Sequence, residues 1–154
     1  MRIIYVAIAA SVSLGLGVAG TAAMTPAQVE PSKQARRATA PLVPLSEADL
    51  TSTKQTGCTC TFDSGNRTLV QAIGNELMVR TRAGRQVCRL TDARFTQISG
   101  GAGTYRCGGV SMTLRETGRR ESSPETDSSS GPSRLTLVQG RTKRTVNGTF
   151  GCAC

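Results

Sequence analysis

The sequence has 154 residues, a formal net charge of +9 and only 3% aromatic residues, with no Trp and three Phe. So few large apolar side chains exclude a domain held together by its core alone, and small domains of this kind are stabilised by disulfides or a metal. The chain has no His, which excludes the usual general base and the Ser-His and Cys-His pairs of nucleophilic catalysis. We therefore expect a protein that is not an enzyme and that uses no cofactor.

The first 23 residues have the layout of a secretory signal peptide. Arg2 gives a positive start, residues 3–19 are apolar, and small residues follow up to Ala23. The pattern predicts cleavage between Ala22 and Ala27, and a periplasmic or secreted mature protein with no stable membrane span. The alternative is a retained transmembrane anchor, which the short run rich in Ala and Gly disfavours.

Residues 24–46 have the composition of a disordered linker, because four prolines are spread among Ala, Gln and basic residues without apolar periodicity. The remainder, residues 47–154, makes one small β-domain. This domain has 15 Lys or Arg and 9 Asp or Glu, so its charge is +6. Such a charge predicts attraction to acidic glycans and anionic lipid heads, whereas the scarcity of aromatic residues argues against nucleic acid. The sequence leaves the oligomeric state open.

In the first half of the domain, the sequence pattern predicts β-strands joined by tight turns. Residues 58–62 alternate, with Cys58, Cys60 and Phe62 on one face. Residues 91–98 predict either a helical turn capped by Thr91 or irregular structure. Between these segments, β-rich runs joined by Gly-containing dipeptides predict hairpins at 67–73, 76–82 and 85–90.

The second half predicts more strands and one long loop. Residues 117–133 are polar and have no periodicity, which predicts a loop. Further strands are expected at 104–107, 110–116, 134–140 and 145–154. Seven or eight short antiparallel strands in about 108 residues give the fold class, an all-β barrel or sandwich.

Two Gly-Cys-x-Cys segments bracket the domain, one with Cys58 and Cys60 and the other with Cys152 and Cys154. Residues two apart in a strand lie roughly 6.6 to 6.8 Å apart with parallel side chains, so neither segment suits an internal disulfide. Facing positions on neighbouring antiparallel strands are within disulfide range. Six cysteines allow 15 pairings, and this reasoning favours Cys58–Cys154, Cys60–Cys152 and Cys88–Cys107.

The four outer thiols could instead hold a metal, either Zn(II) or, with help from Met78 or Met112, Cu(I). Familiar structural zinc sites use Cys-x-x-Cys spacing and often His, whereas this chain has Cys-x-Cys and no His. An oxidising compartment also favours disulfides. We therefore expect disulfides and no metal site.

Two groups of charged residues are further candidates for a site. Carboxylates near the long polar segment could flank a glycosidic bond, although a Ser-rich loop is a poor place to hold two carboxyl groups at a fixed separation. These carboxylates are Glu116, Glu121, Glu125 and Asp127. Arginines around the central hairpin could form an anion-binding patch, although a solvated strand face is the commoner role. They are Arg80, Arg82, Arg85 and Arg89.

The order of these features resembles the C-type lysozyme inhibitor family, small secreted or periplasmic β-barrel proteins. In that family a cysteine of an early strand links to one near the C-terminus. The resemblance covers residues 57–154 and rests on the cysteines, the hairpin "ELMVRTRAGRQVCRL", the loop "ISGGAGTY" (Ile98–Tyr105) and the strand and turn "MTLRETG" (Met112–Gly118). It implies a barrel that inhibits lysozyme through the Ser-Gly loop and the following strand.

The resemblance implies a contact edge made of Ser99, Gly101, Tyr105 and Arg115. Ser99 matches the first serine of the family's loop, whereas Gly101 replaces a second one. The family's lysine position holds Arg115 or Glu116, depending on alignment, and only the arginine could bind lysozyme carboxylates. C-type lysozymes are basic, so a domain of charge +6 gains no electrostatic steering towards them. The expected partner is therefore either a lysozyme or an anionic glycan or lipid of the envelope.

Overall fold

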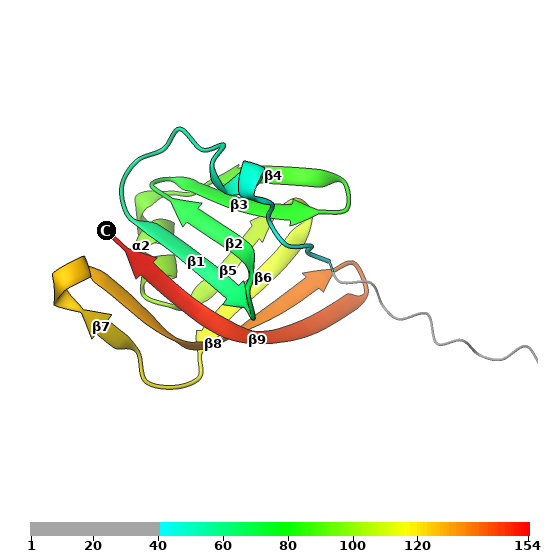
Figure 1. The fold of residues 1–154 in the computed structure, drawn as a ribbon. Helices are drawn as coiled ribbons and strands as arrows, with labels where there is room; N and C mark the ends of the chain where they lie inside the picture. The colour runs from blue at the N-terminus through cyan, green and yellow to red at the C-terminus, as the bar shows by residue number, and fades with distance from the viewer. Residues whose placement is uncertain (1–40) are drawn as a thin grey trace, which may run out of the picture. The chain divides into compact units, whose positions relative to one another are not determined.

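The structure, a computed structural model, describes residues 41–154. The predicted signal peptide and residues 24–40 of the predicted linker lie outside the described residues. No helix within residues 41–154 is long and apolar enough to cross a membrane. In chain order the elements (Figure 1) are α1 (Glu47–Leu50), β1 (Thr59–Ser64), β2 (Arg67–Ile73), β3 (Glu76–Thr81), β4 (Gly84–Arg89), α2 (Asp92–Ser99), β5 (Gly103–Cys107), β6 (Val110–Glu116), β7 (Glu121–Ser123), a 3-10 turn (Pro124–Thr126), β8 (Ser128–Gln139) and β9 (Thr142–Ala153).

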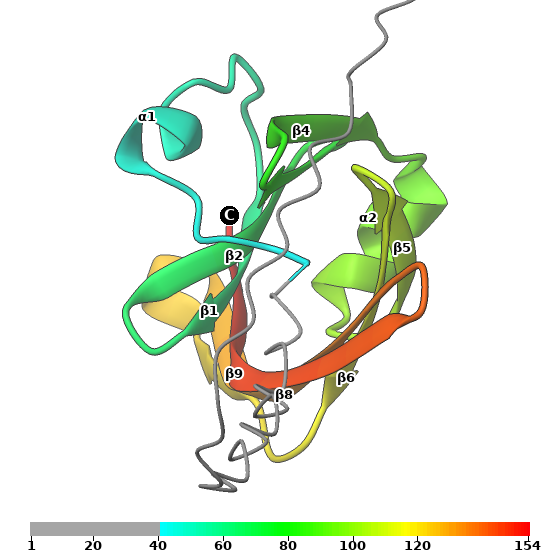
Figure 2. The same cartoon turned by 90° about the vertical axis from the view of Figure 1, so that its right-hand side faces the viewer.

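The strands form one antiparallel sheet that curls into a nearly closed barrel (Figure 1 and Figure 2). Hydrogen-bonded neighbours follow the order β4-β3-β2-β1-β9-β8-β6-β5, and β7 pairs with β8 outside this path. The two end strands, β4 and β5, are joined by the Cys88–Cys107 disulfide, whose Cα atoms lie 5.7 Å apart. The prediction of a disulfide-stapled all-β fold is therefore confirmed, and the sheet takes the barrel form.

The core fills the inside of the barrel because inward positions along the strands are apolar. In β6, Val110, Met112 and Leu114 are buried and alternate with more exposed polar residues. Phe62 of β1 faces Phe150 of β9 in register, and each is 1% exposed. The alternation seen in the sequence is therefore the alternation between the core and the solvent.

Helix α2 connects β4 to β5 and adds to the core. Thr91 caps its N-terminus, because its side chain accepts a hydrogen bond from the backbone N–H of Arg94. Ile98 on its inner side is 2% exposed and belongs to the same apolar cluster as the strands. The helical alternative for residues 91–98 is therefore the correct one.

Two disulfides side by side join the first strand of the sheet to the last. β1 pairs with β9 in a register that sets Cys60 opposite Cys152, with Cα atoms 4.0 Å apart. Just beyond them Cys58 bonds Cys154, with Cα atoms 4.1 Å apart. Strand geometry predicts these two pairs, and Cys88–Cys107, expected because these two cysteines are then left to each other, is also present. We call the two adjacent disulfides the latch.

Residues 117–133 are not a loop, contrary to the prediction. They contain β7, the 3-10 turn and the first half of β8, which pairs with the end of β9. Gly131 and Ser133 occupy buried inward positions of β8. A Cβ atom on Gly131 would lie 3.0 Å from the backbone of Arg120. Because the backbone of Arg119 and Arg120 passes close to this part of β8, only small residues fit at its inward positions. The sequence therefore lacks the alternation of large apolar and polar residues that identifies a half-buried strand.

The folded part also begins before residue 47, within the predicted linker. Leu42 and Leu45 are 3% and 7% exposed. Val43 donates its backbone N–H to the carbonyl of Arg80 at 2.9 Å, and Leu45 donates to a carbonyl of β2. The composition of residues 41–46 indicates a linker because prolines interrupt it, but the apolar residues between the prolines pack on β2 and β3.

Candidate functional site

The residues that the resemblance implies as a contact edge have mixed exposure. Gly101 is buried, and Tyr105 is 5% exposed with its hydroxyl donating to the carbonyl of Ala102. Burial raises the pKa of Tyr105 to about 12, so this phenol stays neutral in the fold. Only Ser99, which is partly exposed, and Arg115, which is exposed, are open to a partner. Tyr105 therefore serves the core, and the expected contact role for Gly101 and Tyr105 is not supported.

Arg120, which the sequence did not single out, joins the Ser-Gly loop to the end of β6. Its Nη1 donates to the carbonyl of Ser99 at 2.9 Å and to Oγ of Ser129 at 3.2 Å. Its Nε donates to Oε1 of Glu116 at 2.6 Å, and the guanidinium lies 5.7 Å from the ring centroid of Phe150. Arg120 belongs to the segment predicted as a loop, which offered no signal for a buried contact.

The predicted anion patch on the β3–β4 hairpin is partly neutralised within the fold. Arg80 donates to both carboxylate oxygens of Asp49, at 2.7 and 2.8 Å. This bidentate hydrogen bond holds the pKa of Asp49 well below its usual range, and it raises the pKa of Arg80. Arg85 donates to Ser52, and Arg89 stands opposite Glu76 in the sheet. Arg82, in the turn after β3, is exposed. The four arginines therefore do not form a free cationic cluster.

A second basic surface lies on the outward positions of β5, β6, β8 and β9. Register pairs set these positions side by side across the four strands. The surface carries four exposed cations and, within the described strands, no Asp or Glu at the outward positions that define it. We call it the basic face, and it consists of Thr104, Arg106, Ser111, Thr113, Arg115, Arg134, Thr136, Val138, Lys143, Thr145 and Asn147.

Two arginines of the basic face, Arg115 of β6 and Arg134 of β8, stand directly opposite each other. Like charges at facing positions destabilise a sheet. Within residues 41–154 the ion pairs are Arg80–Asp49 and Arg120–Glu116, so neither arginine of this pair has a carboxylate partner there. An anion bound between the two guanidinium groups would relieve their repulsion.

The other facing arginine pair, Arg80 and Arg85 on β3 and β4, provides an internal comparison. In that pair the fold itself supplies a counter-charge, Asp49. On the basic face, Arg134 donates to the neutral Oδ1 of Asn147 at 3.3 Å, and no other side chain within residues 41–154 accepts a hydrogen bond from it. Both are pairs of facing arginines on neighbouring strands, and they differ because a carboxylate neutralises only the Arg80–Arg85 pair.

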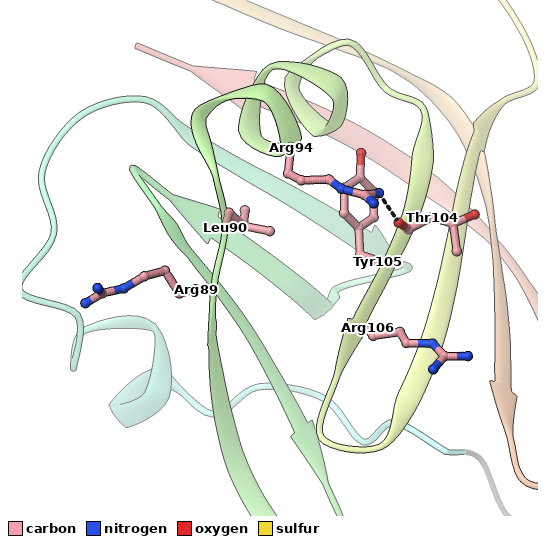
Figure 3. A pocket seen from close by; sticks show the side chains of 6 residues that line it. All are labelled: Arg89, Leu90, Arg94, Thr104, Tyr105 and Arg106. Carbon is pink, nitrogen blue, oxygen red and sulfur yellow. Dashed lines mark hydrogen bonds between the residues drawn. The ribbon is translucent and has the colours of Figure 1, made fainter.

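A cavity of about 410 Å³ opens between β4 and β5, where the barrel is not closed by hydrogen bonds (Figure 3). Arg94 extends over this region and its Nη1 donates to the carbonyl of Thr104 at 2.9 Å. Arg89 and Arg106 extend in opposite directions, so the charged groups do not converge on one small ligand. The cavity adds positive charge beside the basic face, and its lining residues are Arg89, Leu90, Arg94, Thr104, Tyr105 and Arg106.

The acidic residues lie outside the basic face. Glu116 is bound to Arg120, and the remaining candidates for acid–base work, Glu121, Glu125 and Asp127, are exposed on β7 and the turn after it. Glu47 and Asp49 belong to α1. Asp63, Glu76 and Asp92 lie on β1, β3 and α2, so acidic groups are spread over the domain and are absent from the basic face.

All six cysteines are disulfide-bonded, which leaves the thiolate–metal alternative without its ligands. Among residues 41–154, moreover, no three His, Cys, Asp or Glu side chains come together as a metal site would require. Comparison with protein-family models, with curated proteins and with solved structures finds no match to this chain.

Proposed function

We propose that the protein is an exported, non-enzymatic binding module that uses its basic face to hold anionic polymers of the cell envelope. The observation that carries this proposal is the facing pair of Arg115 and Arg134, which has no carboxylate partner among the described residues. Arg106 and Lys143 add charge on the outer strands of the same face. Export rests on the predicted signal peptide and agrees with the three disulfides.

The electrostatics of the face favour a polymer over a single small anion. Exposed charges are screened over about 8 Å at physiological ionic strength, so each cation acts on the part of a ligand that lies close to it. Four cations spread across four strands therefore bind best to a ligand with several charges along its length. Binding of this kind should weaken steeply as salt is added.

Retention of the oxidised protein on immobilised polygalacturonate, an anionic polysaccharide, tests the proposal. Arg115→Gln/Arg134→Gln should elute at clearly lower salt than the wild type. Arg82→Gln/Arg85→Gln removes the same charge from the β3–β4 hairpin and should elute close to the wild type. Equal shifts in both double variants would mean that net charge alone governs retention, and the assignment to the basic face would be wrong.

Inhibition of a C-type lysozyme is the second candidate function. The observation in its favour is that Arg120 joins Ser99 in the Ser-Gly loop to Glu116 at the end of β6. The loop and the strand end that the family uses are therefore neighbours in this fold. Titrating the oxidised protein against C-type lysozyme in a cell-wall lysis assay tests this function, and unchanged lysis at excess protein rules it out.

A further inference from the structure

We infer that the ligand of the basic face is an extended anionic polysaccharide that crosses the four strands along a row of threonines. This inference rests on the proposed function and specifies the class and direction of its ligand. It follows from the register of the sheet, which aligns side chains of the same kind on four consecutive strands.

The row consists of one threonine from each strand. Thr104 of β5 is opposite Thr113 of β6, which is opposite Thr136 of β8, which is opposite Thr145 of β9. Neighbouring strands are about 4.8 Å apart, so the row is roughly 14 Å long. The hydroxyls of Thr104 and Thr113 are hydrogen-bonded to each other at 3.0 Å, which orients that end of the row.

Long cationic side chains flank the row on both sides. Arg106 and Lys143 lie two residues along their strands on one side, and Arg115 and Arg134 lie two residues along theirs on the other. Two residues of a strand span about 6.8 Å. The short threonines therefore form a row across the strands, with longer basic side chains on each side of it.

The chemistry of the threonine row and of the basic side chains beside it suits a charged sugar chain. Threonine hydroxyls donate and accept hydrogen bonds, as sugar hydroxyls require, and the branched Thr side chain has few rotamers to lose on binding. Guanidinium and ammonium groups on the two sides pair with carboxylate, sulfate or phosphate groups of the chain. A linear polymer lying along the row meets both kinds of contact at once.

Two other anionic partners fit this surface less well. The basic face has no Phe, Tyr or Trp on which bases of a single-stranded nucleic acid could stack. Val138, which is 38% exposed, is its only apolar side chain, so the face has little to insert into a lipid bilayer. We therefore infer that the ligand is a polysaccharide, and the test below also measures binding to single-stranded DNA and to anionic lipid.

Oligogalacturonates of increasing length, titrated into the full oxidised protein, provide the test. Affinity should rise with length until the oligomer spans roughly 14 Å, and neutral oligosaccharides of the same lengths should not bind measurably. Thr113→Val/Thr136→Val should lower the affinity roughly tenfold, because two hydroxyl contacts are lost. Thr149→Val, on the same outward side of β9 but beyond the row, is the matched control and should bind as the wild type does.

The salt dependence separates failure of this inference from failure of the proposed function. In Arg115→Gln/Arg134→Gln the slope of log affinity against log salt should become shallower by about 1.4, whereas in the threonine variant it should stay as in the wild type. Normal binding by the threonine variant would overturn the threonine row while anion binding stands. Normal binding by both variants would overturn the proposed function as well.

Two further outcomes bear on the choice of a polysaccharide and on the role of the threonine row. Equal affinity for single-stranded DNA, or for anionic lipid vesicles, with the same loss in both variants would overturn the choice of a polysaccharide. Should the double threonine variant not fold, as shown by its unfolding transition, the single variant Thr145→Val at an exposed position of β9 replaces it. That variant should still lose several-fold in affinity, and unchanged binding would overturn the inference.

Discussion

Removing one disulfide of the latch should cost less stability than removing Cys88–Cys107, although the latch closes far longer loops. Cys58–Cys154 spans a sequence separation of 96 residues, whereas Cys88–Cys107 spans only 19. A disulfide stabilises by reducing the entropy of the unfolded chain, in proportion to the logarithm of the loop that it alone closes. While Cys60–Cys152 remains, Cys58–Cys154 alone closes only the small ring between the two bonds.

The chain-entropy relation gives the magnitudes. An isolated link across the whole domain is worth about 4.7 kcal/mol, and a loop of about 20 residues about 3.3 kcal/mol. The ring between the two latch bonds contains about six residues, so either bond contributes only about 2 kcal/mol while the other is intact. Removing both should cost about 7 kcal/mol, well above the sum of the two single losses.

Urea unfolding of the oxidised variants is the assay. Cys58→Ala/Cys154→Ala is compared with Cys88→Ala/Cys107→Ala, and then with the variant lacking both latch bonds. The Cys58–Cys154 bond is the better choice for the single removal, because its half-cystines are more exposed than Cys60 and their loss changes little packing. A loss of about 4 to 5 kcal/mol from this variant would refute the reasoning, since each latch bond would then act independently.

Two further predictions concern single residues. Gly101 and Gly109 share a φ of +74°, but a Cβ on Gly101 would overlap Arg120 and Glu116, whereas Gly109 faces open space. Gly101→Ala should therefore lower the free energy of unfolding by roughly 2 kcal/mol, because the ends of Arg120 and Glu116 must move and their hydrogen bond is disturbed, and Gly109→Ala by roughly 1 kcal/mol; equal losses would contradict the packing. Asp49→Asn should be less stable than the wild type at neutral pH, because the pKa of Asp49 is lowered in the folded state. That difference should be complete above about pH 4 and shrink as pH falls towards the folded pKa, so equal differences at about pH 2 and about pH 6 would contradict it.

The strands and disulfides could be predicted from the sequence because the patterns that identify them are local. Alternation around Met112 and the Gly-Gly turn before it define β6 without reference to the rest of the chain. The latch follows once the first and last strands are taken as neighbours. Residues 117–133 were mispredicted because the inward positions of this part of β8 face another stretch of backbone, where Gly131 and Ser133 replace apolar residues.

The basic face could not be predicted from the sequence, because it depends on the register between strands that are far apart in the chain. Arg115 and Arg134 become a facing pair only when β6 and β8 align, and no property of either segment reveals this. The hairpin arginines stood out because they are close in sequence. The neutralisation of Arg80 by Asp49 depends on the packing of α1, and the linker-like composition of the residues before α1 gave no sign of this packing.

The pairing of β1 with β9 also sets the order of events during synthesis. β1 can pair early with β2, but its other neighbour, residues 149–153 of β9, is made only after most of the domain. Nearly a hundred residues therefore emerge with Cys60 unpaired, since its partner is Cys152. Barrel closure is consequently slow relative to the formation of local hairpins, because it joins residues that are far apart in sequence. The bond between Cys60 and Cys152 therefore joins two strands that no local turn brings together, and it can form only after nearly all of the domain has been made.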